Sequence, residues 1–495
     1  MKKPVLIAAL AASLPFATPL WAHSPPTVSA PAADFAVLDA AFAKWMEESH
    51  VPGLVWGVVK DGKLVHVKAL GVQELDGRTP VTPDTAFRIA SMTKAFTGYS
   101  ILRLRDEGKL RLDDPVSKYV AETKGWADAI TVGDLLHHTA GFVTDDPWGD
   151  RQQPLPEAEF TKMLKAGVPF TAAPDTRYEY SNFGYALLGR IVTNASGQDY
   201  AERVGATVLK PLGMAATRYE VRDVPQGRLA KGYRWENGAW SLEPTMAHGA
   251  FGAMGGLVTT GEDYARWIGY LLSAWPAIDK EAQSAKTIRA MQYGGGLLHS
   301  RRRPGAEGDS CRLSAIYGAG LVAASDCTLG NVLFHGGGFP GYGSHMLLVP
   351  DAGLGVFALS NRTYAGPSGP VWDAATALFK SGFASPRALP ISDHLRTAYA
   401  TARRIWQAGG VEGESRNLAM NFAMDRSDAN WRRILAEAAA KSGTCDLDAA
   451  IVPTGRLSGR FSWNCANGKI EGSLLLAPTA DPQIQSLAFQ SVAKP

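Results

Sequence analysis

The chain has 495 residues, of which 46% are hydrophobic and 20% are charged. This length predicts two or three domains, and the composition is that of a folded protein and excludes a largely disordered one. With 50 basic and 47 acidic residues the chain is nearly neutral, which argues against binding to nucleic acid or to an anionic membrane surface.

The N-terminus has the pattern of an export signal. Lys2 and Lys3 precede a mostly apolar run over residues 5–20, which is followed closely by Ala22. Charged, apolar and small residues in this order are typical of secretory signals, so we predict a signal peptide over residues 1–22 and a periplasmic or secreted protein. No later apolar stretch has the length of a membrane span, so we expect no stable membrane insertion.

The first half of the chain predicts a hairpin followed by helices. A helix is expected over residues 38–48, and LVWGVVKDGKLVHVKAL predicts two strands around Asp61-Gly62, a dipeptide typical of tight hairpins. FRIASMTKAFTGYSILRL has apolar residues at helical spacing, so we expect a helix that includes Ser91 and ends near Gly108. A largely helical region then runs to about residue 220.

Ser91 and Lys94 are three residues apart in the second of these segments. Residues at i and i+3 share one face of a helix, with Cβ atoms about 5–6 Å apart, so a lysine amine can reach a serine hydroxyl. A serine in that position can lose its proton and act as a nucleophile. The alternatives are a serine that caps the helix and a lysine that is a solvated charge.

Strand patterns return late in the chain, at residues 320–324, 331–334, 345–349 and 353–359. An early hairpin and several late strands that bracket helices predict an α+β fold. We expect an antiparallel sheet built from both ends of a domain over residues 34–385, flanked by helices and with a helical region inserted. The triplet Arg301-Arg302-Arg303 is expected to be a solvated loop.

A second domain is predicted over residues 386–495. Ser392 can cap a helix that ends at Gly409, a further helix is expected over residues 429–441, and Asn467-Gly468 marks a hairpin. These elements predict a small α+β accessory domain.

The four cysteines form an even set, which in an exported protein indicates disulfides. Three pairings are possible. Proximity in sequence favours Cys311–Cys327 and Cys445–Cys465, each closing a loop that contributes about 3 kcal/mol in the chain-entropy model. A metal site would need tighter spacing of the cysteines.

Two further segments carry candidate site residues. In RYEYSNFGYALLG, Tyr180 and Asn182 precede an apolar helix. They either pack and cap that helix, or supply a proton acceptor and an amide that holds a substrate carbonyl. In HGGGFPGYGS, the glycines after His335 either form a turn or leave backbone N–H groups free to bind an oxyanion.

The pair His137-His138 invites interpretation as a metal site. Adjacent histidines on a helix point apart, and no carboxylate stands at a useful spacing. We therefore expect structural histidines, and neither a metal nor an organic cofactor.

The motifs S-M-T-K, Y-S-N and H-G-G occur in this order, beginning at Ser91, Tyr180 and His335. Together they resemble the signature of the serine β-lactamase and penicillin-binding-protein superfamily. Segments such as LLHHTAGF and HGGGFPGYGSHMLLVPDAGLGV resemble the branch that holds class C β-lactamases, D-alanyl-D-alanine carboxypeptidases, D-aminopeptidases and related esterases. The resemblance covers about residues 35–380 and implies a β-lactamase/transpeptidase-like fold. The C-terminal domain resembles small cystatin-like accessory domains.

The resemblance implies an exported serine hydrolase that forms an acyl-enzyme and cleaves an amide or ester, in a D-amino-acid peptide, a β-lactam or a short ester. Ser91 would be the nucleophile, and either Lys94 or Tyr180 the general base. The implied substrate-binding residues are Asn182, His335, Gly337 and Gly338, with the backbone N–H groups of Ser91 and Gly338 as the oxyanion hole. A carboxylesterase of the same fold and a penicillin-binding or peptidoglycan sensor without turnover are the alternatives.

One motif departs from the class C pattern, which has K-T-G where this chain has H-G-G. His335 is expected to add polar or partly cationic character to the site. Gly336 lacks the hydroxyl that helps to bind a substrate carboxylate, so fast β-lactam turnover is not expected. The expected partner is a small molecule or peptide, including peptidoglycan fragments, and no nucleic acid.

Overall fold

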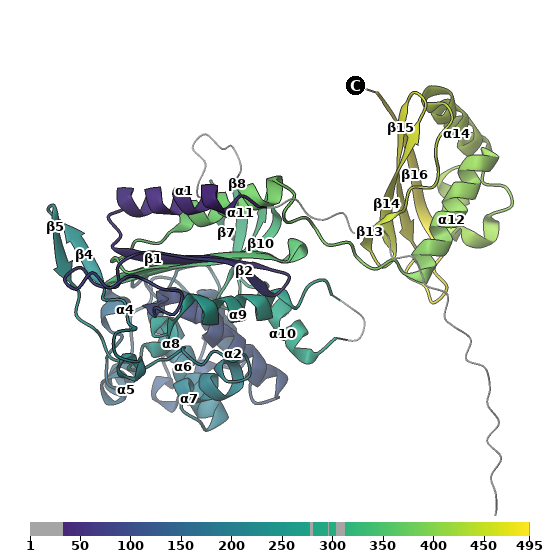
Figure 1. Cartoon of the computed structure of the whole chain (residues 1–495). Coiled ribbons are helices and arrows are strands. Elements are labelled where there is room, and N and C mark those ends of the chain that lie inside the picture. Colours follow the sequence, from purple (N-terminus) through teal and green to yellow (C-terminus); the bar gives the residue numbers. More distant parts are fainter. Residues whose placement is uncertain (1–32, 278–280, 296, 303–311, 495) are drawn as a thin grey trace, which may run out of the picture.

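The computed structural model describes residues 33–277, 281–295, 297–302 and 312–494. An eight-stranded antiparallel sheet, in the order β2-β1-β12-β11-β10-β9-β8-β7, organises the chain as far as residue 380 (Figure 1). Its strands are β1 (Gly53–Lys60), β2 (Lys63–Gly71), β7 (Leu297–Arg302), β8 (Arg312–Tyr317), β9 (Val322–Asp326), β10 (Gly330–Phe339), β11 (Tyr342–Val349) and β12 (Leu354–Ser360). Because β1 pairs with β12, the early hairpin joins the late strands, and the predicted α+β fold is confirmed.

The β1–β2 hairpin forms at the predicted dipeptide. Asp61 and Gly62 both have positive φ, 50° and 78°, as a type I′ turn requires. Seven of the eight residues of β1 are buried, because this strand lies inside the sheet and helices cover both of its faces.

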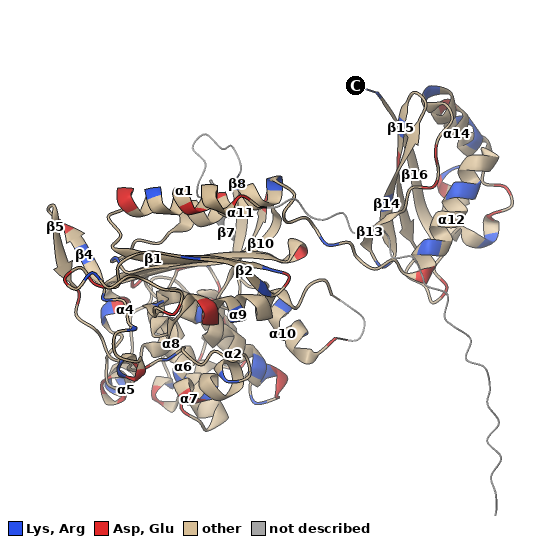
Figure 2. Ribbon diagram, in the orientation of Figure 1, with Lys and Arg blue, Asp and Glu red and all other residues tan. Residues whose placement is uncertain are grey.

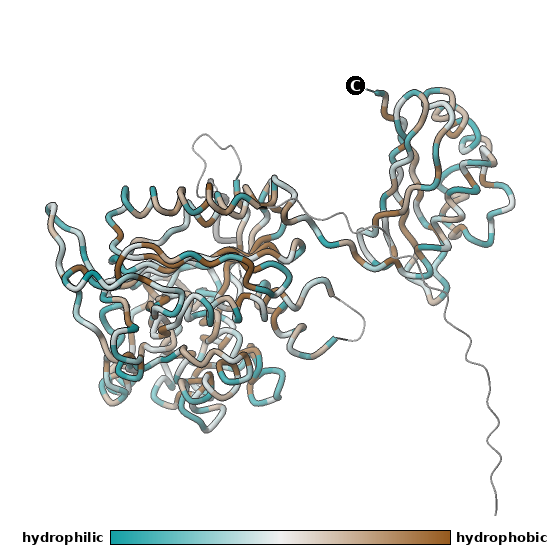
Figure 3. The backbone as a smooth tube through the Cα atoms, in the orientation of Figure 1, coloured by the Kyte–Doolittle hydropathy of each residue, from teal (hydrophilic) through white to brown (hydrophobic). Residues whose placement is uncertain are grey.

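Two helical layers enclose the sheet (Figure 1). One layer holds α1 (Phe35–Glu48) and α11 (Ser368–Lys380), which pack on the sheet through Phe42, Trp56 and Trp372. The helices of the other layer include α2 (Lys94–Asp106), α6 (Asn182–Ser196) and α9 (Gly261–Leu272). Figure 3 shows the most hydrophobic backbone along the central strands, and Figure 2 shows charges of both signs spread over the outer helices.

Shorter elements complete the helical side of this domain. They are β3 (Phe87–Arg88), α3 (Val132–His137), α4 (Trp148–Arg151), α5 (Glu157–Ala166), α7 (Tyr200–Val204), β4 (Tyr233–Glu236), β5 (Ala239–Leu242), α8 (Gly252–Gly255), β6 (Val258–Thr259) and α10 (Gln283–Ala290).

Several predicted boundaries were wrong. Ser91 does not begin an α-helix but lies in a 3₁₀ turn over Ala90–Thr93, and α2 starts only at Lys94. Arg301 and Arg302, predicted in a solvated loop, belong to β7, which pairs with β8. The segment Leu297–Arg302 lacks regular alternation of apolar and polar residues, so its strand character comes from pairing with its neighbour and was not visible locally.

A separate core organises the C-terminal domain. Helices α12 (Asp393–Ala408), α13 (Met420–Asp425) and α14 (Asp428–Ser442) accompany a four-stranded antiparallel sheet of β13 (Val452–Gly455), β14 (Ser458–Cys465), β15 (Gly468–Leu476) and β16 (Ile484–Ala493). The predicted cap is confirmed, since the Ser392 side chain accepts from the N–H of Leu395, and Gly409 ends α12 with φ 65°. Trp463 is fully buried in this core.

The predicted Cys445–Cys465 disulfide is present. Cys311 lies outside the described residues, so its pairing with Cys327 stays a prediction. Among the described residues, no helix combines the length and the apolar character needed to cross a bilayer.

Candidate active site

Ser91 is held between two short strands and the main sheet. The pairing of β3 with β6 leads the chain into the 3₁₀ turn, where Ala90 has φ 49° although it is not glycine. A residue in the left-handed region costs conformational energy and persists where its surroundings require it. Ser91 itself is only 7% exposed and reaches solvent through a cleft.

Lys94 lies directly beneath the serine. Its Nζ is fully buried and donates to Oγ of Ser91 at 3.1 Å, to Oδ1 of Asn182 at 2.7 Å and to the carbonyl O of Met254 at 2.9 Å. Burial lowers the pKa of Lys94 to about 8, against the opposing pull of nearby aspartates. The predicted contact between serine and lysine is therefore present, and the solvated-lysine alternative is wrong.

Tyr180 lies beside this pair. Lys94 Nζ is 4.8 Å from the centroid of its ring. The Tyr180 hydroxyl oxygen is buried, and no residue in the described part of the chain meets hydrogen-bond geometry with it, although the Ser91 hydroxyl is close enough to lower its pKa. Burial, followed by the charge of Asp146, outweighs that effect and raises the pKa of Tyr180 well above its usual value. The phenol is therefore protonated at neutral pH.

Asn182 is the first residue of α6 and is fully buried. Its Oδ1 accepts from Lys94, and its Nδ2 donates to Asp146. The cap of α6 is supplied by its neighbours, because Ser181 accepts from Gly184 N and Asp145 accepts from the backbone N–H groups of Asn182 and Phe183. The capping alternative for Asn182 is wrong. Its side chain links Lys94 to Asp146, which belongs to the acidic loop over residues 144–150.

The H-G-G segment lies inside β10, and the turn that follows it is at Pro340-Gly341. Strand β9 pairs with β10 only through Gly330–Phe334, so His335 to Gly338 form an open strand edge. A β-carbon on Gly337 would clash with Oγ of Ser344 and with the carbonyl O of Ile89. Glycine here lets the turn that carries Ser91 approach the strand.

Of the two characters predicted for His335, polar or partly cationic, the structure supports the polar one. The side chain is buried, its Nε2 lies 2.8 Å from the Tyr317 hydroxyl and its Nδ1 lies 2.5 Å from the carbonyl O of Gly336. Burial, then the charge of Lys94, lowers the pKa of His335 to about 4. A neutral imidazole satisfies both contacts, with Nδ1 donating and Nε2 accepting.

Gly336 lines the cleft through its backbone. A β-carbon at this position would lie 3.2 Å from Nδ1 of His345, whose Nε2 accepts from Trp372 on α11. A threonine side chain would therefore start toward the α11 layer, so the geometry does not support the expectation that a missing hydroxyl at residue 336 governs carboxylate binding.

The cleft has a volume of about 560 Å³. It brings several predicted site residues together with the acidic loop over residues 144–150 and with Tyr364, neither of which the sequence analysis identified. Its lining is Ser91, Thr144, Asp146, Pro147, Asp150, Tyr180, His335, Gly336, Gly338 and Tyr364. Lys94, Asn182 and Gly337 are buried behind this lining. The missed loop reads TDDPWGD, and its three aspartates within six residues are the signal that could have found it.

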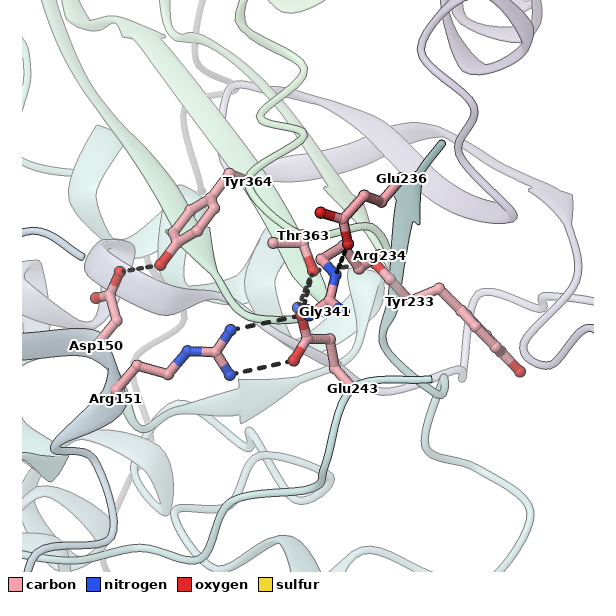
Figure 4. Close-up of polar contacts among 9 residues, drawn as sticks. All are labelled: Asp150, Arg151, Tyr233, Arg234, Glu236, Glu243, Gly341, Thr363 and Tyr364. Carbon is pink, nitrogen blue, oxygen red and sulfur yellow. Dashed lines mark hydrogen bonds and ion pairs between the residues drawn. The ribbon is translucent and has the colours of Figure 1, made fainter. Parts of the chain in front are cut away.

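Asp150 is 2% exposed and accepts from the Tyr364 hydroxyl at 3.1 Å (Figure 4). Burial, then the charge of Asp146, raises the pKa of Asp150 to about 7. Burial also raises the pKa of Asp145. The acidic loop therefore holds carboxyl groups that the fold desolvates, and this burial favours their protonated form.

His138 supports the site from behind. Its carbonyl O accepts from the N–H of Glu179 at 2.8 Å, and its Nδ1 accepts from the N–H of Ser181 at 3.1 Å, so it bonds both neighbours of Tyr180. The centroids of the His138 and Tyr180 rings are 4.4 Å apart. Within the described residues, no cluster of three or more potential metal ligands includes His137 or His138.

These positions combine the parts needed for acyl transfer. A serine is bonded to an amine whose pKa is lowered, a protonated phenol lies beside them, and an open strand edge faces the cleft. Such an arrangement can attack a carbonyl, move the proton of the nucleophile and bind an extended substrate.

Comparison with known proteins gives relatives that share this site-bearing domain. Protein flp of Staphylococcus aureus is 28% identical over 336 residues, which are 66% of this chain and 62% of that protein. Beta-lactamase-like protein 2 of Dictyostelium discoideum is 30% identical over 258 residues, 49% of this chain and 46% of that protein. The chain thus spans less than two thirds of the length of the curated relatives it matches.

Among solved structures, the octameric penicillin-binding protein homologue from Pyrococcus abyssi has the same fold, with a TM-score of 0.58 and 22% identity. The match covers 90% of this chain and 97% of that one. The beta-lactamase family profile matches residues 38–380, the domain that carries the sheet and the cleft. The chain belongs to the beta-lactamase family, within the β-lactamase/transpeptidase-like superfamily.

Proposed function

We propose that the protein is a serine hydrolase that cleaves an amide or ester through an acyl-enzyme on Ser91. The observation that carries this proposal is the 3.1 Å contact between Nζ of buried Lys94 and Oγ of Ser91. In the proposed reaction Oγ attacks the carbonyl carbon, the serine proton passes to the base, and water later releases the acyl group. The backbone N–H groups of Ser91 and Gly338 bind the oxyanion.

Lys94 is the general base in this mechanism. A pKa of about 8 leaves about a tenth of the amine neutral at pH 7, whereas burial keeps the Tyr180 phenol protonated. The phenol then serves as a proton donor to the leaving group. Asn182 holds the lysine through its Oδ1 and holds Asp146 through its Nδ2.

The substrate class we propose is a D-amino-acid peptide or amide, or a short ester, rather than a β-lactam. His335 at the third motif resembles the carboxypeptidase and aminopeptidase members of the class C-like branch, which supports this choice. The cleft of about 560 Å³ has room for a small acyl group together with its leaving group.

We also propose that the protein is exported to the periplasm or secreted. The apolar N-terminal run supports this placement, and the Cys445–Cys465 disulfide is of a kind that persists in oxidising compartments. The C-terminal domain would then be an accessory to the hydrolase.

The deciding experiment is intact-mass measurement after treatment with a fluorophosphonate. We expect one adduct on the wild-type protein and none on Ser91→Ala. Ser100→Ala is the matched control, because Ser100 is a buried serine of α2 that bonds the carbonyl O of Phe96 in its own helix. An adduct on Ser91→Ala, or none on the folded wild type, would rule the proposal out.

A substrate panel on one preparation separates the remaining possibilities. It contains nitrocefin, a D-Ala-D-Ala peptide, D-amino-acid amides and p-nitrophenyl esters. Stable labelling by penicillin without turnover of any member would identify a sensor, and turnover of esters alone would identify a carboxylesterase.

A further inference from the structure

Among the described residues, two carboxylates of the cleft have no cationic partner. Asp146 and Asp150 line the cleft together with Ser91. In the part of the chain that the structure describes, neither carboxylate forms an ion pair with lysine, arginine or histidine. The groups that bond them are neutral: the amide of Asn182 donates to Asp146 and the hydroxyl of Tyr364 donates to Asp150.

The arginine that follows Asp150 in sequence does not neutralise it. Figure 4 shows the Arg151 guanidinium directed toward Glu243 and away from the Asp150 carboxylate. Arg151 Nη1 lies 3.1 Å from Glu243 Oε2, and Arg234 lies 3.4 Å from the other oxygen of the same carboxylate. Glu243 therefore pairs with both neighbouring arginines, and neither arginine pairs with Asp146 or Asp150.

Three carboxyl groups and one lysine lie around the nucleophile. Lys94 supplies at most one positive charge, against the three carboxylates of Asp145, Asp146 and Asp150 that act on it. Desolvated carboxylates are costly unless they are paired, and the raised pKa of Asp150, about 7, reflects that cost. A cation bound in the cleft would stabilise the ionised form of Asp150, which burial disfavours.

Two further features of the cleft are available for hydrogen bonds with a ligand. The buried Tyr180 hydroxyl lines the same cleft and has no hydrogen-bond partner among the described residues. The edge of β10 from His335 to Gly338 is not paired by β9. A bound molecule that satisfies the phenol and the strand edge would lie across Ser91, next to the acidic loop.

We propose that the cleft selects substrates that carry a protonated amino group near the carbonyl attacked by Ser91, and that Asp146 and Asp150 bind this group. The substrate class is that of aminoacyl amides and esters with a free amine. Substrates with a carboxylate at the same place meet like charge and are disfavoured. This inference rests on the proposed hydrolase function and specifies its substrate.

The test compares alanine p-nitroanilide with N-acetylalanine p-nitroanilide, in which an acetyl group removes the charge of the amine, each in D and L form. We expect kcat/KM to favour the free amine about tenfold or more, the usual scale of a hydrogen bond between charged groups. The preference should fall as salt is added, because screening weakens the attraction. A ratio of one, or a preference for the acetylated substrate, would overturn the inference.

Two isosteric variants locate the effect. Asp146→Asn and Asp150→Asn keep an oxygen that accepts from Asn182 and Tyr364 but lose the charge, so each should reduce the preference about tenfold. Asp113→Asn is the control, since Asp113 is exposed, pairs with Arg111 and does not line the cleft. An unchanged preference in both cleft variants would overturn the assignment.

Labelling by the fluorophosphonate separates this inference from the proposed function. Labelled Ser91 with no preference for the free amine refutes the inference alone, whereas unlabelled Ser91 refutes the hydrolase itself. If neither anilide turns over, protection of Ser91 by alaninamide is compared with protection by N-acetylalaninamide. Equal protection would also overturn the inference.

Discussion

Burial gives Lys94 the chemistry that an exposed lysine lacks. The amine has no exposed surface, and its three hydrogen-bond partners, Ser91, Asn182 and Met254, are all neutral. Desolvation disfavours the ammonium form, and the nearby aspartates keep the pKa from falling further. At the scale of single residues, the acidic loop therefore tunes the base as well as lining the cleft.

The first prediction concerns the pH dependence of acylation. Because the neutral amine is the active form of the base and its pKa is about 8, the rate should rise about tenfold per pH unit below pH 8 and level above it. The rate of fluorophosphonate labelling measures this profile. Asp150→Asn should move the inflection below pH 8, because the charge of Asp150 raises the pKa of Lys94. Asp113→Asn is the control, since exposed Asp113 pairs with Arg111 and should leave the inflection in place. A rate that still rises above pH 10 would instead identify Tyr180 as the base.

The second prediction concerns the two proton-transfer residues. Lys94→Ala and Tyr180→Phe should each slow acylation on the order of 10²–10⁴-fold, the usual range for a positioned acid or base. Both measurements need circular dichroism to confirm folding, since both residues belong to the packed interior. A loss below about tenfold in a folded variant would show that the role of that residue is misassigned.

At the scale of elements, the site forms where a turn, a strand edge and a helix start meet. The 3₁₀ turn with Ser91 packs on β10, Ser344 Oγ donates to the carbonyl O of Ile89 at 2.8 Å, and α6 presents Asn182 at its first residue. These contacts fix the backbone of the nucleophile before any substrate binds.

The third prediction tests the contact between the turn and the strand. Gly337→Ala should slow acylation of Ser91 by about 10²-fold or more, because the new β-carbon clashes with the carbonyl O of Ile89 and displaces the turn. Gly336→Ala is the matched control, since its β-carbon meets only a side-chain atom at 3.2 Å. Equal effects of the two substitutions on labelling rate would contradict this account.

The fourth prediction concerns His138. His138→Ala leaves the buried N–H of Ser181 without an acceptor, so we expect a loss of about 1–3 kcal/mol in the free energy of unfolding and slower acylation. His138→Asn should restore much of both, because asparagine offers an acceptor and tolerates the positive φ of 58° found here.

His137→Ala is the control for that prediction, since His137 is the neighbouring histidine and makes neither contact with the residues that flank Tyr180. Urea unfolding and the labelling rate are measured on all three variants. Equal losses in His137→Ala and His138→Ala would show that neither histidine positions the tyrosine.

At the scale of the whole molecule, the two domains have separate hydrophobic cores. Arg387 in the connecting segment still bonds the first domain, with its N–H donating to Asp351 O at 2.7 Å and its Nη2 to Pro350 O at 2.6 Å. The connecting segment is therefore bonded to the first domain at Arg387, two residues after the predicted boundary at residue 385.

The fifth prediction is that a protein truncated after Leu389 folds and is still acylated on Ser91. Every residue of the proposed site lies before that point, and the truncation keeps the contacts of Arg387. Circular dichroism and intact mass after labelling are the measurements. A folded truncated protein that resists labelling would show that the C-terminal domain completes the site.

Local sequence determined much of this protein. The Asp61-Gly62 turn, the cap at Ser392 and the spacing of Ser91 and Lys94 depend on residues a few positions apart, so their outcome could be predicted from the chain itself. The order of the three motifs likewise indicated the family.

Only the tertiary structure determined which strands pair and which side chains share the cleft. Strand β7 exists because β8 pairs with it, and the neutral state of His335 follows from burial beside Lys94. The acidic loop stands about 55 residues after Ser91 in the chain, and folding alone brings Asp146 and Asp150 into the same cleft. Burial and long-range proximity set charge and pKa, and neither property is a function of local sequence.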